Sequence, residues 1–307
     1  MRVYSQADVI SALPYQTLVR DLPKLLLKKT ESPQRHVHTV QQAGEPDASL
    51  LLMPAWSPSG KGGVKIVNVT PGNSARSLPA VTASYLLFDT VTGEHTALLD
   101  GGELTARRTA AVAAIAADRL AMSDAKRLLL VGSGRIASEL AFAYRAVRPI
   151  ETVAVYSQTR DNAEKLVDAL IAAGFRAQVC DDLQTGVSSA EIIACATLSQ
   201  QPLVKGVWLK PGQHVALIGG YTPDMREADD EAIRRARVWV DTYAGLSEAG
   251  DLVQPLSHGV IRLEDIKGTL TDLCAVSSIA ERDNTITLFK SVGDASQDLA
   301  AASLALA

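Results

Sequence analysis

The chain has few cysteines and no excess of positive charge, and each shortage excludes a class of protein. Its three cysteines, Cys180, Cys195 and Cys274, are too few and too scattered for a disulfide framework or a paired-cysteine metal site. Lysine and arginine number 30 against 34 aspartates and glutamates, so the formal net charge is −4. No basic field is therefore available for nucleic acid or an anionic membrane, and we expect a small-molecule ligand.

Long apolar runs are also missing. No segment approaches the roughly 18 to 20 apolar residues that a membrane-spanning helix needs. The N-terminal stretch MRVYSQADVISALPYQTLVRDL has charges and a proline where a secretory signal peptide has an unbroken apolar core. Together with the few cysteines, this predicts a reducing, cytoplasmic setting.

Histidine is scarce, and its spacing does not suggest a metal site. No carboxylate or cysteine accompanies the histidines at ligand spacing along the chain; they are His36, His38, His95, His214 and His258. We therefore expect no bound metal.

Short apolar strands alternate with helices through the middle of the chain. This alternation is typical of parallel βαβ units whose sheet is covered on both faces. It predicts an α/β fold with a Rossmann-type doubly wound parallel sheet domain over residues 119–285. The expected strands are 127–131, 152–156, 175–179, 191–196, 214–218 and 238–241, and the expected helices are 136–147, 160–173 and one around 229–237.

The two ends of the chain have a different pattern. Strand-like segments separated by glycine, proline and asparagine predict antiparallel hairpins, one of them turning at Thr92 and Gly93. The alanine-rich residues 104–122 predict one long helix, and residues 285–307 a strand, a turn and an apolar helix that packs on the N-terminal part. Residues 1–118 and 286–307 are thus expected to form an α+β domain built from both chain ends.

The segment LLLVGSGRIASE has the GxGxxA form of the dinucleotide fingerprint, with Gly132, Gly134 and Ala137 at the small positions. The first glycine permits a tight turn, the second lets backbone N–H groups approach a pyrophosphate, and the small third residue lets helix and strand pack closely. An apolar strand precedes the motif and a helix follows it, as the fingerprint requires. We expect Gly132, Gly134, Arg135 and Ile136 to bind a nicotinamide dinucleotide.

The end of the second strand indicates which dinucleotide is bound. An NAD enzyme usually has an acidic residue there that accepts hydrogen bonds from the ribose hydroxyls. This chain has Ser157, Thr159 and Arg160 instead, which do not repel a 2′-phosphate, so NADP(H) is favoured over NAD(H). The alternative is that Arg160 is only a solvated residue in the first turn of its helix.

Several separated segments resemble one family, that of the ornithine cyclodeaminases and μ-crystallin. They are GVKIVNVTPGNSARSLPAVTASYLLFDTVTGEHTALLDGGELTARRTAA, VGSGRIAS, GGYTPDMREADDE, EAGDLVQP and ITLFKSVGDASQDLAAA, and they extend over nearly the whole chain. The resemblance implies a homodimer in which the domain built from both chain ends binds substrate and pairs subunits. It leaves the reaction open, because the family includes ornithine cyclodeaminases, an alanine dehydrogenase and reductases of cyclic imino acids.

The resemblance also implies roles for individual residues. Arg35 matches an arginine that holds the substrate carboxylate, Lys65 a lysine that contacts its carboxylate or nitrogen, and Arg108 an arginine beside both substrate and nicotinamide. The remaining matches are positions that contact the cofactor: Thr82, Thr109, Thr197, Ile218 and Ser291. Taken without the family, Lys65 would be an exposed strand lysine and Arg35 a surface residue. Arg107 and Arg108 are adjacent on a helix and point in different directions, so we expect at most one to face the site.

The turn HVALIGGYTPDMRE distinguishes the reactions. Ornithine cyclodeaminases have a catalytic aspartate directly after this strand, whereas the matching residue here is Tyr221, and Met225 replaces a lysine. Asp224 lies three residues further on, and Pro223 fixes the intervening turn. The turn resembles that of the μ-crystallin and Δ1-pyrroline-2-carboxylate reductase branch. There the protein has mainly to orient a carboxylate and an imine carbon.

We therefore expect reduction of a cyclic imino acid with a five- or six-membered ring to L-proline or L-pipecolate. Lys65, Arg108 and Tyr221 are the expected catalytic residues, and Tyr221 is a candidate proton donor by position alone. The alternatives are ornithine cyclodeamination, an activity like that of alanine dehydrogenase, and a non-catalytic cofactor-binding protein like μ-crystallin.

Overall fold

The computed structural model describes residues 1–58, 60–76, 78–280 and 282–306. The chain divides into two compact units, one formed by Met1–Arg108 with Asp294–Ala307 and the other by Thr109–Gly293. The first unit is thus built from both chain ends. The division falls ten residues earlier than the expected 118/119 boundary, within the long helix α3 (Gly101–Leu120), which contributes residues to both units.

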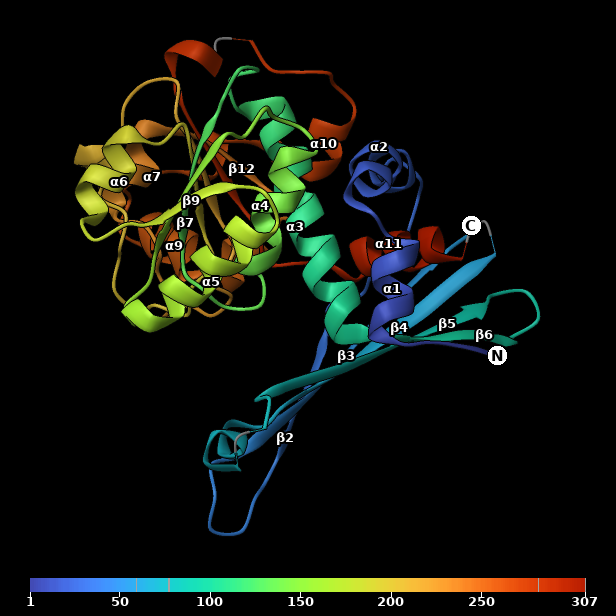
Figure 1. Cartoon of the computed structure of the whole chain (residues 1–307). Coiled ribbons are helices and arrows are strands. Elements are labelled where there is room, and N and C mark those ends of the chain that lie inside the picture. The colour runs from blue at the N-terminus through green and yellow to red at the C-terminus, as the bar shows by residue number, and fades with distance from the viewer. Residues whose placement is uncertain (59, 77, 281, 307) are drawn as a thin grey trace. The chain divides into compact units, whose positions relative to one another are not determined.

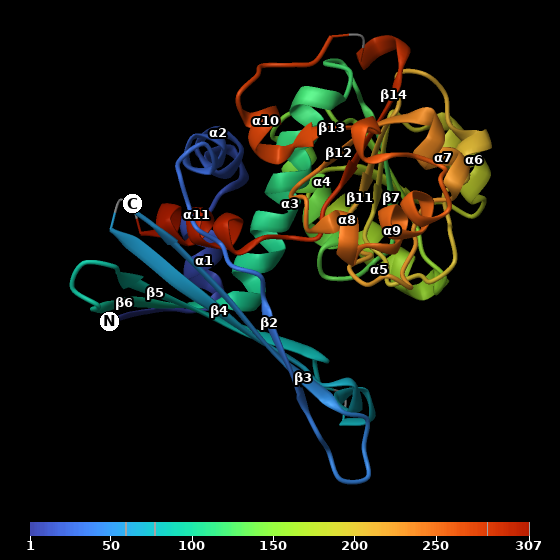
Figure 2. The ribbon, with the colours of Figure 1, turned by 180° about the vertical axis from the view of Figure 1, so that it is seen from behind.

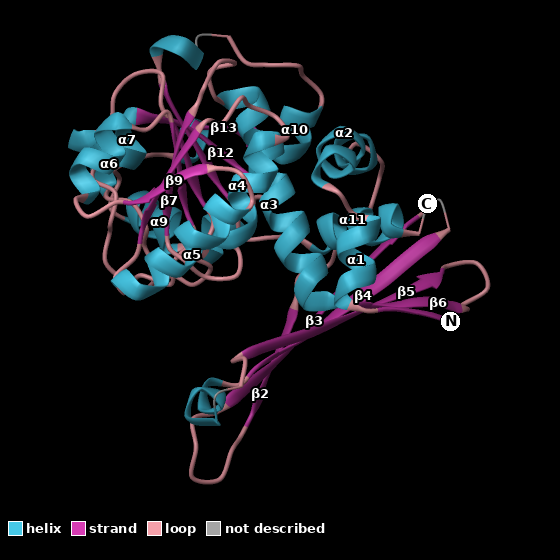
Figure 3. Cartoon of the chain, in the orientation of Figure 1, coloured by secondary structure: helices cyan, strands magenta, loops and turns pink. Residues whose placement is uncertain are grey.

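The second unit contains an eight-stranded sheet in the order β13-β12-β14-β11-β10-β7-β8-β9. Every neighbouring pair is parallel, and Figure 3 shows helices packed around the strands. The strands are β7 (Arg127–Val131), β8 (Thr152–Tyr156), β9 (Arg176–Val179), β10 (Ile192–Cys195), β11 (His214–Leu217), β12 (Ala236–Val240), β13 (Ile266–Thr269) and β14 (Ile286–Lys290). The predicted α/β class with a Rossmann-type sheet is confirmed.

The order of the sheet reverses between β7 and β10. The chain first moves outward from β7 to β8 and β9, then returns to β10 and continues outward on the other side. Because parallel crossovers are right-handed, this reversal puts the two sets of helices on opposite faces of the sheet. The helices of this unit are α4 (Ala137–Arg145), α5 (Arg160–Ala172), α6 (Leu183–Ser189), α7 (Asp230–Arg235), α8 (Gly245–Glu248), α9 (Gly250–Ser257) and α10 (Leu270–Cys274), with 3-10 turns η2 (Gly206–Trp208), η3 (Leu263–Asp265) and η4 (Arg282–Asn284).

The strand β14 lies between β11 and β12 in this sheet, although residues 286–290 were expected with the chain ends. All five of its side chains are buried, as are all four of β10 and of β11. A strand with two buried faces needs helices on both sides, which a central position in a doubly wound sheet provides. The strand nature of the segment was therefore correctly predicted, and its partners differ from the expectation.

The first unit contains a six-stranded sheet in the order β1-β6-β5-β4-β3-β2. From β2 to β6 each strand pairs antiparallel with the next, and β1 joins parallel to β6. Gly93 has φ +74° in the turn between β5 and β6, which confirms the predicted hairpin. The strands are β1 (Arg2–Tyr4), β2 (His36–Val40), β3 (Ala48–Ser57), β4 (Lys61–Val69), β5 (Val81–Asp89) and β6 (His95–Asp100), with the 3-10 turn η1 (Pro71–Arg76) between β4 and β5.

Three further helices belong to this unit: α1 (Gln6–Ala12), α2 (Tyr15–Leu26) and α11 (Ala295–Ala305). The C-terminal helix α11 packs on β3, β4 and α2, as expected for an apolar helix that must cover a surface (Figure 1). It brings residues from the end of the chain against strands from its first third. This packing places an acidic residue of α11 beside two predicted site residues.

Candidate functional site

The turn after β7 has the backbone geometry of a phosphate-binding loop. Gly132 has φ +113°, and a Cβ there would stand 2.6 Å from the carbonyl oxygen of Ala196, so only glycine fits. A Cβ on Gly134 would meet no described atom within 4 Å, which leaves open space at the N-terminus of α4. Backbone N–H groups at such a helix end suit a pyrophosphate.

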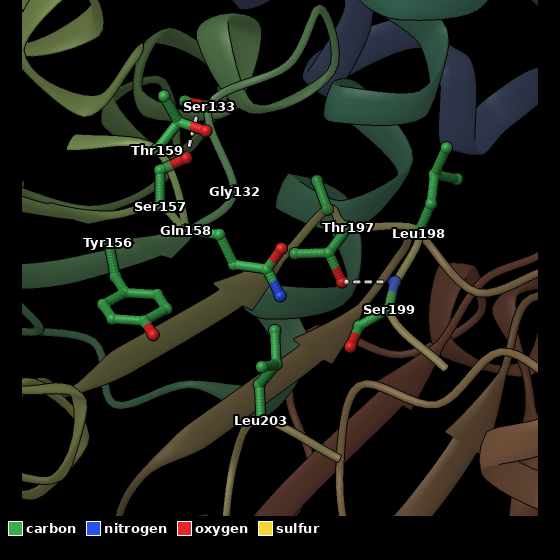
Figure 4. Close-up of a pocket in the computed structure, with 11 residues that line it drawn as sticks. Gly132, Ser133, Tyr156, Ser157, Gln158, Thr159, Thr197, Leu198, Ser199 and Leu203 are labelled. Atoms are coloured by element: carbon green, nitrogen blue, oxygen red, sulfur yellow. Dashed lines mark hydrogen bonds between the residues drawn. The ribbon is translucent and has the colours of Figure 1, made fainter. Parts of the chain in front are cut away.

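A cavity of about 300 Å³ opens at the C-terminal ends of β7, β8 and β10 (Figure 4). Since β7 and β10 are the strands between which the sheet order reverses, this is the position where open α/β sheets bind ligands. The cavity brings together four predicted cofactor residues, Gly132, Ser157, Thr159 and Thr197. It is lined in addition by Ser133, Tyr156, Gln158, Ala196, Leu198, Ser199 and Leu203.

None of these described lining residues is acidic. The Ser133 hydroxyl donates to the Ser157 hydroxyl at 2.9 Å, which fixes the end of β8 against the glycine turn. Figure 4 shows Gln158 extending from the same strand end into the cavity. The position at which NAD enzymes usually have a carboxylate is therefore occupied here by hydroxyls and an amide.

The two predicted arginines of this region do not line the cavity. Arg160 pairs with Glu164 at 2.8 Å and also with Asp181, and Arg135 pairs with Glu139. Both arginine side chains are exposed to solvent, so these ion pairs contribute little to stability and exchange partners readily. Gly134 and Ile136 border the turn and likewise do not line the cavity.

A buried glutamate, Glu227, links the residues that follow β10 and β11 by hydrogen bonds. Glu227 accepts hydrogen bonds from the Thr197 amide at 2.7 Å, the Thr197 hydroxyl at 2.9 Å and the Gly219 amide at 2.9 Å. Thr197 follows β10 and Gly219 follows β11, so one carboxylate joins the ends of both strands. Burial raises the pKa of the Glu227 carboxyl, and nearby Lys290 opposes that shift.

A second buried pair supports this carboxylate. Lys290 and Asp251 lie 3.1 Å apart, and neither side chain is exposed to solvent. The other oxygen of Asp251 accepts from the amides of Glu227 at 2.8 Å and Ala228 at 3.1 Å. The segment that follows the Tyr221 turn is therefore tied to α9 and β14.

The other predicted cofactor positions of this unit lie at strand ends or on α3. Ile218 is buried directly after β11, and Thr109 is buried on α3. The Ser291 hydroxyl, directly after β14, donates to Asp241 at 2.8 Å. In the first unit, Thr82 is exposed on β5 opposite Asn68 of β4, and no contact assigns it a role.

The first unit holds a buried ion cluster. Lys65 on β4 and Arg108 on α3 are 3% and 4% exposed, and both contact Asp298 of α11, which is 0% exposed. The Lys65 ammonium lies 2.7 Å from Oδ2 of Asp298, and Nε of Arg108 donates to Oδ1 at 2.6 Å. The reading of Lys65 as an exposed strand lysine is therefore wrong.

Further groups surround this cluster. Arg108 also donates to the Gln297 side chain at 3.0 Å, and Arg35 is close enough to act electrostatically on Lys65. Burial lowers the pKa of Lys65 to about 8, although Asp298 acts in the opposite direction. Burial opposes ionisation of Asp298, yet Arg108 and Lys65 hold the pKa of its carboxyl below the usual range.

The neighbouring arginine points elsewhere, as predicted. Nε of Arg107 donates to the Leu13 carbonyl at 2.9 Å, and its guanidinium lies 4.5 Å from the centre of the Tyr15 ring. Arg107 thus holds the α1–α2 connection, and Arg108 alone of the two joins the ion cluster.

Tyr221 lies in the turn after β11 and is 43% exposed. Among the described residues its hydroxyl has no hydrogen-bond partner, and Asp224 is also exposed. Because it is exposed, Asp224 is not a buried replacement for the aspartate expected of a cyclodeaminase. Tyr221 as a proton donor stays a prediction.

Two residues that the sequence reasoning missed are Asp298 and Glu227. Both lie within the segments that carry the family resemblance, Asp298 as the second aspartate of DASQDLAAA and Glu227 as the first glutamate of TPDMREADDE. The signal for Asp298 was an acidic residue inside an otherwise apolar, alanine-rich helix, because such a charge needs a partner when buried. Glu227 carried no comparable signal, since acidic neighbours follow it.

Neither a metal cluster nor a membrane span is found in the described parts of the chain. No group of three or more histidine, cysteine, aspartate or glutamate side chains there has an arrangement that could hold a metal ion. No helix there is both long and apolar enough to cross a membrane.

Comparison with known proteins identifies relatives along the whole chain. The sequence model of the ornithine cyclodeaminase/mu-crystallin family matches residues 3–305. A Δ1-pyrroline-2-carboxylate reductase of Paracoccus denitrificans is 37% identical over 88% of this chain and 88% of its own length.

Two solved structures are similar to the chain as well. One is the Δ1-pyrroline-2-carboxylate reductase of Thermococcus litoralis in complex with NADH and L-proline, with a TM-score of 0.92 and 31% identity over 99% of this chain and 96% of that one. The other is an archaeal alanine dehydrogenase dimer with bound NAD, with a TM-score of 0.89 and 29% identity over 99% and 94%.

Replacing Gly132 by alanine tests the phosphate turn. We expect Gly132→Ala to weaken NADH or NADPH binding by roughly tenfold or more, because the backbone must shift away from Ala196. Fluorescence titration of the reduced cofactor measures this. Gly259→Ala is the matched control, since Gly259 also has positive φ (+70°) but no described atom within 4 Å of its Cβ. Unchanged cofactor affinity in Gly132→Ala would refute the assigned turn.

Proposed function

Because the chain belongs to the ornithine cyclodeaminase/mu-crystallin family, we propose that it is an NAD(P)H-dependent oxidoreductase acting on C=N bonds. The proposed reaction is reduction of Δ1-pyrroline-2-carboxylate or Δ1-piperideine-2-carboxylate to L-proline or L-pipecolate. The observation that carries the proposal is the buried cluster of Lys65 and Arg108 around Asp298, with Arg35 nearby. Reductases of this substrate class are among the relatives of the chain.

The cluster is suited to a small carboxylate. Lys65 and Arg108 contact a single protein carboxylate, that of Asp298, so the three side chains carry a net positive charge that suits a substrate anion. Arginine offers a planar pair of donors that matches a carboxylate, and its positive charge is permanent. We assign Arg35 and Arg108 to the substrate carboxylate and Lys65 to the imine end.

The residues of the glycine turn fit a dinucleotide. Gly132 allows the tight turn, the space at Gly134 suits a pyrophosphate, and Thr197 lines the same cavity. When bound, the reduced cofactor supplies the hydride. Thr82, Thr109, Ile218 and Ser291 stay proposed cofactor contacts on the family resemblance.

We further propose a preference for NADP(H). Support comes from the described lining residues, which include Ser157 and Thr159 and no carboxylate. Arg160 follows directly and would have to leave Glu164 and Asp181 to meet a 2′-phosphate. Because those partners are exposed, the exchange costs little.

Three other functions are alternatives to imine reduction, and each requires a different site or a different result with substrate. Ornithine cyclodeamination needs a positioned acid or base at the amines, and the turn after β11 offers the exposed Tyr221 where cyclodeaminases have aspartate. An activity like that of alanine dehydrogenase requires pyruvate and ammonia as substrates. A non-catalytic cofactor-binding role requires that no imino acid is reduced.

A substrate panel separates these functions. We expect stoichiometric oxidation of NADPH or NADH, followed by absorbance at the nicotinamide band, with pyrroline or piperideine carboxylate. We expect no ammonia release from L-ornithine with NAD and no turnover of pyruvate plus ammonia. Ammonia release from ornithine would contradict the assignment, and cofactor binding without any oxidation would favour the non-catalytic role. The ratio of kcat/KM for NADPH and NADH tests the cofactor preference.

We also propose a homodimer formed through the six-stranded sheet. Helices α1 and α11 pack on one face of this sheet (Figure 2). The other face carries half-exposed apolar side chains such as Val64, Leu86 and Leu98, which are directly opposite one another on β4, β5 and β6. A face of this kind fits a second copy of the chain. The archaeal alanine dehydrogenase of similar structure is a dimer, which supports a dimeric state for this chain. A cytoplasmic location is proposed as well, consistent with the free thiols of Cys180, Cys195 and Cys274.

Multi-angle light scattering tests the dimer. We expect a mass close to twice the 32.6 kDa of the chain, and Leu86→Lys should shift it toward the monomer because a charge would enter the apolar contact. Val207→Lys on the exposed η2 turn is the control that should leave the mass unchanged. A monomeric wild-type protein would contradict the proposal.

A further inference from the structure

We propose that Asp298 is a positioning residue, which keeps the Lys65 ammonium charged and fixed beside Arg108 so that Lys65 delivers the proton taken up by the substrate nitrogen. The inference deepens the proposed function and rests on it, because reducing an imine requires a proton at nitrogen for each hydride at carbon. It assigns different tasks to the cations of the cluster.

The geometry separates these tasks. Each oxygen of Asp298 contacts a different cation, Oδ2 the Lys65 ammonium at 2.7 Å and Oδ1 the Arg108 Nε at 2.6 Å. The three side chains come from β4, α11 and α3, and all are almost fully buried. A carboxylate shared in this way fixes both cations and compensates part of the cost of burying them.

The charge balance of the cluster disfavours a protonated substrate. Two cations, the Lys65 ammonium and the Arg108 guanidinium, contact the single carboxylate of Asp298, so the three side chains together carry a net positive charge. A substrate carboxylate reduces this excess, whereas a protonated imine would restore it. The imine should therefore bind mainly in its neutral form and receive its proton at the site.

Only one of these groups is suited to give a proton. Arginine keeps its protons under all physiological conditions. Tyr85, which lies opposite Lys65 on β5, is buried, and burial raises the pKa of its hydroxyl well above the usual range. The pKa of Asp298 lies below its usual range, so it is already ionised. Lys65, with a pKa of about 8, is charged at neutral pH and can release its proton.

A hydride from the reduced nicotinamide forms the C–H bond at the imine carbon, and the π electrons of the C=N bond move to nitrogen. There they form an N–H bond with the Lys65 proton. The cofactor is left oxidised, the substrate is left as the amine, and Lys65 is left neutral and regains a proton from water. Asp298 stays ionised throughout and stabilises the recharged ammonium.

The kinetics of four proteins against pH test this assignment, with pyrroline carboxylate as the substrate. In the wild type, kcat/KM should fall tenfold per pH unit above about pH 8, where Lys65 loses its proton. In Asp298→Asn this alkaline limb should move to lower pH by about one unit or more, because the anion that favours the charged lysine is gone. Asp298→Glu retains the charge, so the limb should stay near that of the wild type although kcat falls.

Lys65→Arg separates proton delivery from carboxylate binding. Arginine keeps the positive charge but does not release a proton, so KM for the imine should change only a few-fold while kcat falls by about 100-fold or more. Cofactor titration and thermal unfolding check that each variant is folded. If Asp298→Asn does not fold, the wild-type profile and Lys65→Arg decide.

Two results would overturn the inference. One is a Lys65→Arg enzyme with wild-type kcat, and the other is an alkaline limb that does not respond to Asp298→Asn or that moves equally in Asp298→Glu. If the proposed function itself is wrong, the result is distinguishable from these two, because the wild-type protein would then reduce neither cyclic imine.

Discussion

The buried contact of Lys65 and Arg108 with Asp298 is the interaction on which the first unit depends. Charges are costly to bury, and a carboxylate placed between two cations offsets part of that cost only when all three are held in fixed geometry. The three residues come from β4, α3 and α11, so the C-terminal helix must return to the N-terminal strands. A unit built from both chain ends follows from this requirement.

The second unit also contains buried carboxylates, which here hold strand ends and the segment that follows β11. Glu227 joins the ends of β10 and β11, and Asp251 and Lys290 hold the segment that contains it. The residues that follow β10 line the cavity that also contains the glycine turn. Through its hydrogen bonds to Thr197, Glu227 fixes one of the residues that line the cavity without lining it itself. In both units, then, the residues most directly tied to the proposed chemistry are held by a buried carboxylate.

Much of this arrangement could be predicted from the sequence, for identifiable reasons. Alternating apolar strands and helices gave the Rossmann-type sheet, and the GxGxxA motif gave the turn at Gly132. Lys65 is different, because its alternating strand predicts an exposed side chain and only the family resemblance marked it. The partners of β14 were also misjudged, since an apolar strand near the chain end does not reveal which sheet it joins. Asp298 was missed because its contact with Arg108 spans 190 residues, a separation that no local pattern records.

A direct titration of Lys65 tests the central claim of this account, that the cluster holds a lysine able to exchange its proton near neutral pH. Protein labelled with ¹³C at the lysine ε carbon, with Lys65→Arg to assign the signal, reports the charge of this side chain by NMR without any substrate. The account predicts a midpoint near pH 8 for Lys65. A midpoint near the ordinary lysine value of about 10.4 would contradict it.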